Sequence, residues 1–315
     1  MSTAVVEKKK RELKDYEKKW TLWGRIKDNK ASYLFLLPYY VLFVMFTIVP
    51  VIISVYYSFT YYNILEAPQF IGWDNYLNLF LHDDVFILAI QNTFIFAIIT
   101  GPLGYLAAFV FAWFINELPP KIRAIMILIF YAPTISGQVY MVWSIMFSGD
   151  SYGWINGVLL NWGITNTAIQ WTTDTKYMMF VCIVVALWSS LGAGFLSHVA
   201  GLQGMDKELY EAGYVDGISN RWQELWYITL PSMKPQLLFA AVMSITSSFG
   251  AADIMTAMCG FPSTDYAVHT IVNHLQDYGD VRFEMGYASA IAVLLFAVCL
   301  GLNRLIQNLL KKVGT

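Results

Sequence analysis

The chain has 315 residues, of which 57% are hydrophobic and only 13% are charged. An ordinary soluble domain carries about 25% charged residues, so this composition excludes that class and favours a protein that lies in a lipid bilayer. The formal net charge of -2 provides no basic field that would point to nucleic acid. Three widely separated cysteines suggest neither a disulfide framework nor a metal cluster, and we interpret them as small apolar packing residues: Cys182, Cys259 and Cys299.

The first 32 residues form a basic segment with ten lysines and arginines. This segment is too long and too polar for the start of a signal peptide, and no small-residue cleavage site follows the first apolar run. We therefore predict two parts: a cytoplasmic tail over 1–32 and a membrane-spanning domain over 33–315.

Six apolar stretches are long enough to cross a bilayer, which takes about 20 residues per helix. They predict an all-α bundle of six transmembrane helices at approximately 34–58, 86–115, 122–147, 177–200, 236–258 and 285–308. With a cytoplasmic amino terminus, 18 of the 20 lysines and arginines lie inside, and only Lys176 and Arg282 lie outside. Because lysine and arginine concentrate in cytoplasmic loops, both termini are predicted to be cytoplasmic.

Ionisable residues are nearly missing from the predicted helices. Asp253 lies near the outer end of the fifth helix and His198 near the inner end of the fourth. A transporter driven by protons or sodium usually needs such groups near the membrane midplane. The sequence therefore disfavours a self-contained secondary transporter or channel, which we keep as an alternative.

The segment 201–235 joins the fourth and fifth helices and is patterned like a docking element. Apolar and polar residues alternate in it at helical spacing. We predict two short helices separated at Gly217, with Ser219 as N-cap of the second and with Pro231 and Pro235 ending it. A cytoplasmic connector patterned in this way is expected to bind a partner.

A motif in this segment resembles the EAA loop of ABC importer permeases. Glu211-Ala212-Gly213 is followed by Asp216-Gly217, and Ile228-Thr229-Leu230-Pro231 matches the trailing I-x-L-P of the family. Gly213 stands where the family usually has alanine, and Ile218 where alanine commonly follows the Asp-Gly pair. The resemblance implies that a short helix here inserts into a groove of a cytoplasmic ATPase. The residues implied in this coupling are Glu211, Ala212, Gly213, Asp216 and Gly217.

Other motifs resemble the sugar-importer branch of the same family, with a pattern similar to the larger membrane subunit of the maltose importer. They are Phe35-Leu36-Leu37-Pro38 in the first helix, Phe70 to Tyr76 after it, and Gly286-Tyr287-Ala288 near the end. The two extra helices and the large insertion of the maltose subunit have no counterpart in this chain. The resemblance implies a six-helix type I importer permease.

The residues expected along a sugar pathway combine aromatic rings with hydroxyl groups, because a sugar presents flat apolar faces and hydrogen-bonding edges. Serine, threonine and glycine also allow close packing of transmembrane helices, which is the alternative interpretation. Counting from the I-x-L-P motif, the resemblance implies cargo contacts at Thr246, Ser247 and Gly250. The full set of candidates is Ser136, Tyr140, Trp143, Trp188, Ser189, Thr246, Ser247, Phe249, Gly250 and Asp253.

The expected function is that of a non-enzymatic permease subunit in a prokaryotic cytoplasmic membrane. No G-x-x-x-x-G-K-[ST] loop is present to bind nucleotide phosphates. ATP and magnesium are therefore expected in two copies of a separate ATPase subunit. The resemblance also implies a homologous second permease, an extracellular solute-binding protein and a carbohydrate cargo, with the permease itself embedded in membrane lipid. Amino acids, peptides and glycerol phosphate esters remain alternative cargo classes.

Overall fold

The computed structural model describes residues 26, 29–136 and 139–310, and these are almost entirely helical. Strands occur there only as a short antiparallel hairpin of β1 (Thr60–Tyr61) and β2 (Gln69–Phe70). The predicted all-α class is therefore confirmed. Most of the predicted basic tail lies outside the described residues. The chain divides into two compact units, Met1–Tyr56 and Tyr57–Thr315, which we describe separately.

The first unit contains one long apolar helical run. It consists of α3 (Lys30–Phe43), the π-helical turn η1 (Val44–Ile48) and the start of α4 (Val49–Tyr57). Together these elements cover 28 residues, and an 18-residue window within them has a mean hydropathy of 2.4. At 1.5 Å per residue, this run is longer than the roughly 30 Å of a bilayer core, as the sequence predicts for the first span.

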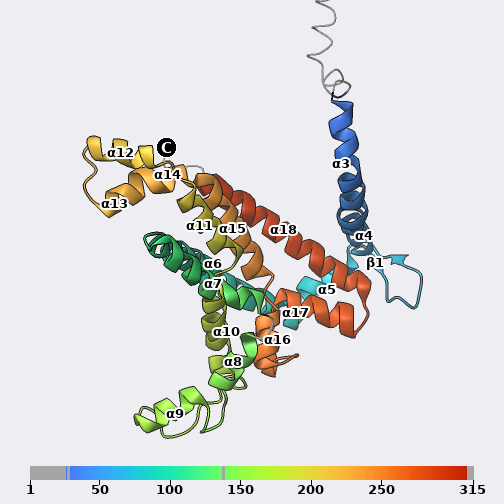
Figure 1. The fold of residues 1–315 in the computed structure, drawn as a ribbon. Helices are drawn as coiled ribbons and strands as arrows, with labels where there is room; N and C mark the ends of the chain where they lie inside the picture. The colour runs from blue at the N-terminus through green and yellow to red at the C-terminus, as the bar shows by residue number, and fades with distance from the viewer. Residues whose placement is uncertain (1–25, 27–28, 137–138, 311–315) are drawn as a thin grey trace, which may run out of the picture. The chain divides into compact units, whose positions relative to one another are not determined.

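The second unit holds the remaining helices (Figure 1). In chain order they are α5 (Asp74–Leu81), α6 (Asp84–Asn116), α7 (Pro120–Ile135), α8 (Val139–Met146), α9 (Trp154–Asn161), α10 (Thr175–Ser189), α11 (Ala193–Gln203), α12 (Lys207–Val215), α13 (Arg221–Glu224), η2 (Leu225–Thr229), α14 (Leu230–Ser232), α15 (Lys234–Phe249), α16 (Asp253–Cys259), η3 (Thr264–Tyr266), α17 (Ile271–Gln276), η4 (Asp277–Val281) and α18 (Met285–Leu310).

Four helical runs in the described residues are long and apolar enough to cross a membrane: Lys30–Tyr57, Asp84–Asn116, Thr175–Gln203 and Met285–Leu309. Two bent helix pairs raise the number to as many as six. The predicted third span is divided into α7 and α8, which lie on either side of 137–138. The predicted fifth span is also divided, because α15 ends at Phe249 and α16 begins at Asp253.

The core of the second unit forms where α10, α11 and α15 pack around α6 (Figure 1). Small residues on α6 allow this close approach. Ala112 is fully buried, and a Cβ atom added at Gly104 would lie 3.0 Å from the Cβ of Ser190. Phe195 of α11 fills the space beside α6 without any exposed surface. Packing of large side chains against small ones therefore holds these helices together.

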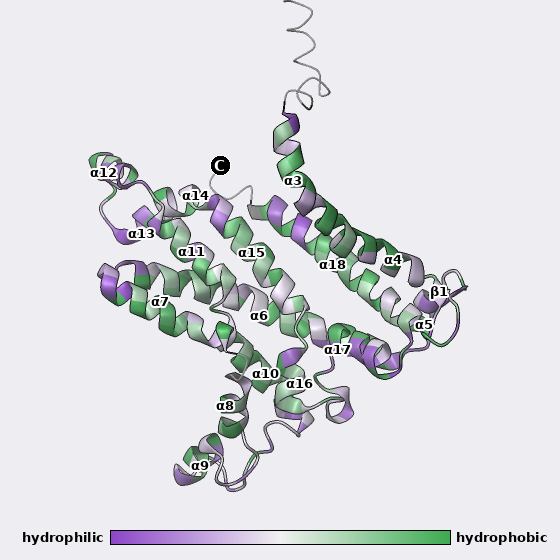
Figure 2. Cartoon of the chain, turned by 45° about the vertical axis from the view of Figure 1, so that its right-hand side comes forward, coloured by the Kyte–Doolittle hydropathy of each residue, from purple (hydrophilic) through white to green (hydrophobic). Residues whose placement is uncertain are grey.

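Hydropathy distinguishes the parts of the second unit (Figure 2). The long helices α6, α10, α15 and α18 are coloured mainly as hydrophobic, whereas hydrophilic residues gather in α12, α13 and the loop between them. In both views α12 and α13 lie at one end of the α6–α11–α15 core, and α8, α9 and α16 lie at the other. The segment with the coupling motif is thus separated from the loops predicted to be extracellular.

Two cysteines that are distant in the sequence meet in the structure. The Sγ atoms of Cys182 in α10 and Cys259 at the end of α16 are 3.8 Å apart, and both thiols are free. Their contact is part of an apolar cluster that also contains Met178 and Met255. The cysteines therefore join α16 to α10 by packing, which agrees with their interpretation as packing residues.

Candidate coupling segment and translocation cavity

The coupling segment begins with α12, whose first turn is capped by Asp206. The carboxylate of Asp206 accepts a hydrogen bond from the amide of Glu208 at 3.1 Å. After α12 the chain turns at Gly217, which has a φ of +95°. This left-handed conformation strains residues that carry a Cβ atom. The predicted break between two helices at Gly217 is confirmed.

The second helix of this segment differs from the prediction at its start. Its N-cap is Asn220, which accepts from the amide of Gln223 at 2.9 Å, and not Ser219. The helix continues through the π-helical turn η2 and α14 and ends at Ser232, between the two prolines predicted to end it. The chain bends by 80° after Ser232, where α15 starts with Pro235 in its first turn. Proline is tolerated there because the first amides of a helix have no intrahelical acceptor.

The predicted coupling residues lie together on α12 and the turn after it. Glu211, Ala212, Asp216 and Gly217 are exposed, and only Gly213 is buried. Exposed apolar side chains accompany them, since 87% of Val215 and 58% of Tyr214 are accessible. A helix that presents a carboxylate beside apolar groups is suited to bind another protein.

Gly213 explains why this motif departs from the usual EAA pattern. A Cβ atom at this position would lie 2.5 Å from Cδ1 of Ile228 and 3.2 Å from Cδ1 of Ile218. The closer contact is with Ile228 of the I-x-L-P motif, and the isoleucine at 218, where the family commonly has alanine, narrows the same space further. Glycine at 213 therefore fits the packing of both isoleucines.

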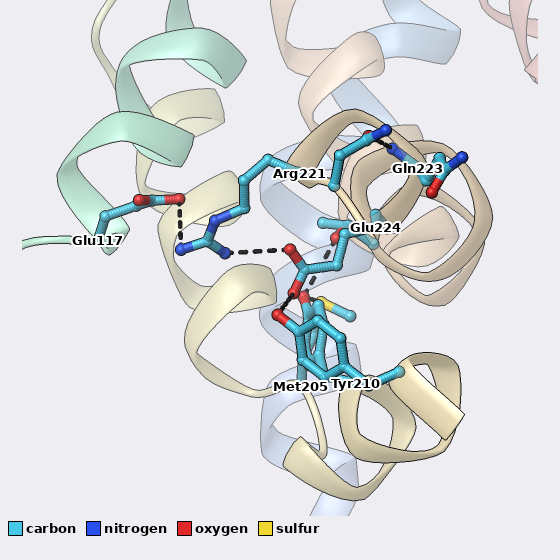
Figure 3. A network of polar contacts seen from close by, with 9 residues as sticks. Glu117, Met205, Tyr210, Arg221, Gln223 and Glu224 are labelled. Carbon is cyan, nitrogen blue, oxygen red and sulfur yellow. Dashed lines mark hydrogen bonds and ion pairs between the residues drawn. The ribbon is translucent and has the colours of Figure 1, made fainter. Parts of the chain in front are cut away.

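An ion-pair network links this segment to the end of α6 (Figure 3). Arg221 contacts Glu117 at 3.1 Å and Glu224 at 3.2 Å. Glu224 is buried, and its second oxygen accepts a hydrogen bond from the hydroxyl of Tyr214 on α12 at 3.5 Å. Arg221 therefore connects the exposed coupling helix, through Glu224, to the long helix that packs at the centre of the core.

A cavity of about 360 Å³ lies between α6, α7, α8, α10, α11, α15 and α16. Five of the ten candidate pathway residues line it: Tyr140, Ser189, Ser247, Gly250 and Asp253. These residues come from four separate stretches of the chain, and the broken spans bring them together. The gap between α15 and α16 places Gly250 and Asp253 at the cavity wall.

The other five candidates do not line this cavity. Ser136 is exposed where α7 ends, and Trp143 and Trp188 pack edge to face at 5.3 Å between ring centres. Thr246 is exposed, with its hydroxyl donating to the carbonyl of Val242 at 2.9 Å, whereas Phe249 is buried against Phe94. Cargo contact by any of the ten candidates stays a prediction.

The cavity wall is rich in hydroxyl groups and poor in charge. Asp253 is its only charged side chain among the described residues, and no lysine or arginine lines it there. His198 is a buried residue of this wall and Ser189 a half-buried one, and the side-chain polar atoms of both have no hydrogen-bond partner in the described part of the chain. The sequence signal at His198 was only that of a lone histidine in an apolar helix.

A second polar cluster joins the start of α6 to the last helices, and the sequence analysis did not identify it. Its members are Asp83, His269, His274, Tyr278 and Tyr287. Oδ2 of Asp83 accepts hydrogen bonds from Nε2 of His274 at 3.0 Å and from the hydroxyls of Tyr287 at 2.9 Å and Tyr278 at 3.4 Å. His269 contacts the other ring nitrogen of His274 at 3.3 Å. We call these five residues the Asp83 cluster.

Electrostatics in the Asp83 cluster favour an ionised carboxylate and a neutral histidine. Burial opposes ionisation of Asp83, but the hydrogen bonds from His274 and from the amide of Phe86 outweigh it and lower its pKa to about 2. Burial, followed by the charge of His274, lowers the pKa of His269 to about 4. The cluster is therefore a polar connection between elements that are far apart in the sequence.

Comparisons with known proteins agree with this architecture. Residues 101–315 match the family described as "Binding-protein-dependent transport system inner membrane component". The chain is 32% identical over 278 residues to the probable ABC transporter permease protein YesP of Bacillus subtilis, covering 86% of this chain and 87% of that protein. It is 28% identical to the arabinooligosaccharides transport system permease protein AraP of Halalkalibacterium halodurans, over 85% of this chain and 84% of the relative.

A lactose transport system permease protein, LacF of Rhizobium radiobacter, is 30% identical over 73% of this chain and 75% of its own length. Among solved structures, a chain of a bacterial alginate ABC transporter in complex with an alginate-bound periplasmic protein superposes with a TM-score of 0.75. The two chains are 24% identical, and the superposition covers 93% of this chain and 98% of the other. At this identity the likeness supports the fold.

The chain belongs to the inner-membrane components of binding-protein-dependent transport systems. It is thus a multi-pass membrane protein and an ABC transporter permease, and the resemblance given by the EAA loop is confirmed.

Proposed function

We propose that this chain is the translocation subunit of an ATP-driven importer for a neutral oligosaccharide. The observation that carries the proposal is the cavity of about 360 Å³, whose wall combines Tyr140 with several serine hydroxyls and contains no lysine or arginine among its described residues. A sugar is bound by aromatic faces together with hydroxyl groups. The relatives named for arabinooligosaccharides and lactose support the same cargo class.

The charge of the cavity wall favours neutral over acidic cargo. A carboxylate or sulfonate placed near Asp253 would be repelled, and the described wall offers no basic side chain to compensate. This comparison is informative because one similar protein is named for sulfoquinovosyl glycerol and a similar structure for the acidic polysaccharide alginate. In this proposal the present chain differs from both in cargo charge.

Energy is proposed to come from ATP and magnesium bound by a separate pair of ATPase subunits. The exposed face of α12, with Glu211 and Asp216 next to Val215, would insert into the ATPase, and Arg221 would pass the movement to α6. A homologous second permease would complete the pathway. The segment α12–α13 would face the cytoplasm and α8, α9 and α16 the outside, since they lie at opposite ends of the core (Figure 1). Both termini would be cytoplasmic, and the two docking sides would lie on opposite membrane faces.

The experiment starts from an affinity-tagged chain purified from membranes of the producing organism. An ATPase and a second permease are expected to copurify. The complex is reconstituted in proteoliposomes with its binding protein, and ATP-dependent uptake of arabinotriose, lactose and sulfoquinovosyl glycerol is compared. We expect uptake of a neutral sugar only. Uptake without the ATPase would contradict the proposal, and so would uptake of sulfoquinovosyl glycerol without uptake of either neutral sugar.

Glu211→Ala tests the coupling step in the same assay. Loss of uptake is expected although the variant still inserts and assembles, because the docking carboxylate is exposed and contributes little to folding. Glu208→Ala is the matched control, since Glu208 is an exposed carboxylate on the same helix outside the motif. Normal ATP-dependent uptake by the Glu211 variant would remove this residue from the coupling mechanism.

A further inference from the structure

His198 is a fully buried polar side chain that the rest of the protein leaves unsatisfied. It has no exposed surface, and neither ring nitrogen has a hydrogen-bond partner among the described residues. Its ring packs edge to face against Tyr105 at 5.2 Å and against Phe109 at 5.4 Å between ring centres. The aromatic contacts hold the imidazole in place without using its nitrogens.

The position of His198 on the cavity wall indicates what those nitrogens could bind. His198 lies on α11, and Tyr105 beside it on α6 lines the same cavity. Ser189, a half-buried residue, also lines this wall, and its inaccessible hydroxyl has no partner in the described part of the chain. A buried polar group that lacks a hydrogen bond is costly, by about 1–3 kcal/mol. Two such groups, on residues that line one cavity, point to a polar ligand inside it.

The chemistry of the two groups fits a hydroxylated, uncharged ligand. A neutral imidazole offers one donor and one acceptor, and a sugar hydroxyl can serve both. The Tyr105 ring supplies an apolar face next to them. A metal ion is not supported, since the described residues contain no group of three histidine, cysteine, aspartate or glutamate side chains that could hold one.

We propose that His198 is a hydrogen-bonding subsite for hydroxyl groups of the transported solute, on the α11 side of the cavity. It is separate from Gly250 and Asp253, which line the wall where α15 gives way to α16. The inference rests on the proposed function, because it assigns a residue to the same cavity and the same cargo class. In this role His198 contacts the cargo after it has passed from the binding protein into the membrane.

The test pairs a side-chain change with a change in the ligand. His198→Phe keeps an aromatic ring between Tyr105 and Phe109 but removes both nitrogens. The probe is arabinotriose or lactose, whichever the wild-type complex imports, together with its monodeoxy analogues. Uptake constants are measured in proteoliposomes that contain the complete transporter. The loss of a hydrogen bond is expected to raise the KM for the parent sugar roughly 3- to 10-fold.

The decisive readout is the response to the deoxy analogues. One or more analogues should lose affinity with the wild type but not with His198→Phe, because the partner of the missing hydroxyl is already gone. Phe195→Leu is the control, since Phe195 is fully buried on the same helix and does not line the cavity. This control should change assembly or overall rate but discriminate the analogues as the wild type does. His198→Asn, which keeps a donor and an acceptor in a smaller side chain, should retain part of the discrimination and covers the case in which the phenylalanine variant does not assemble.

Equal discrimination by wild type and the His198 variants would overturn the subsite while leaving the proposed function intact. Failure of the wild-type complex to import any neutral sugar would instead refute the proposed function, and the subsite with it.

Discussion

Asp83→Asn should destabilise the protein strongly although it changes few atoms. Asparagine caps a helix about as well as aspartate, so the hydrogen bond from Phe86 at the start of α6 is expected to remain. The amide nitrogen would replace Oδ2, however, and Oδ2 is the acceptor for His274, Tyr278 and Tyr287. Three donors would then face a fourth donor.

The size of this effect can be worked from the contacts. Hydrogen bonds to a charged group contribute about 1.5–3 kcal/mol each, and His274 is only 1% exposed in its side chain. Counting the two short bonds, we expect a loss of about 3 kcal/mol in the free energy of unfolding. The lowered pKa of Asp83 agrees in order of magnitude, because a change from 3.8 to about 2 corresponds to roughly 2 kcal/mol.

The assay is equilibrium unfolding of the purified protein in mixed micelles, measured at several pH values. The folded-state pKa of Asp83 is depressed, so its contribution is fully present above the unfolded pKa and is lost as the pH falls through about 2. The difference between wild type and Asp83→Asn should thus be full at pH 7 and shrink in strong acid. Asp84→Asn, an exposed neighbour in the first turn of α6, is the control and should cost about 0.3–1 kcal/mol. Equal stability of the two variants would refute the reasoning.

Three further outcomes are expected from other parts of the structure. Wild-type stability should fall as the pH drops from about 6.5 to about 4, since His269 stays neutral when folded and binds a proton when unfolded; a His269→Asn variant should melt with a flatter profile over that range. Glu117→Gln should cost at most about 1 kcal/mol, whereas Arg221→Ala should cost about 1–3 kcal/mol because buried Glu224 loses its ion pair; similar melting temperatures for both would contradict this ranking. Gly217→Ala should cost about 1–2 kcal/mol through its φ of +95° and reduce ATP-dependent uptake, and an unchanged melting temperature would argue against that backbone strain.

Much of the coupling segment was predictable from sequence because its signals are local. Gly217 allows the left-handed turn, and helical spacing marks the helices on either side of it. The error at Ser219 also has a local cause, because neighbouring Asn220 is an equally good N-cap. The choice between the two depends on geometry that residue type alone does not specify.

The cavity and the Asp83 cluster could not be located in the same way. Asp83 and Tyr287 are separated by 204 positions, and Cys182 and Cys259 by 77. Hydropathy assigns each apolar stretch to the membrane but does not say which face of one helix meets another. For this reason Tyr140 and Ser189 could be ranked with Thr246 and Phe249 in the sequence, although only the first two line the cavity.

The amino-acid sequence by itself showed that this protein lies in a lipid bilayer, and it gave the approximate membrane spans and the protein family. Those properties follow from composition, from the length of apolar runs and from a short motif with local spacing. Only the tertiary structure decided where the third and fifth spans break and which hydroxyls share one cavity. It also decided that buried His198 has no hydrogen-bond partner among the described residues, whereas half-buried Asp83 has several. The physical reason is that hydrogen bonding and burial depend on neighbours from distant segments, which packing of the helices brings together.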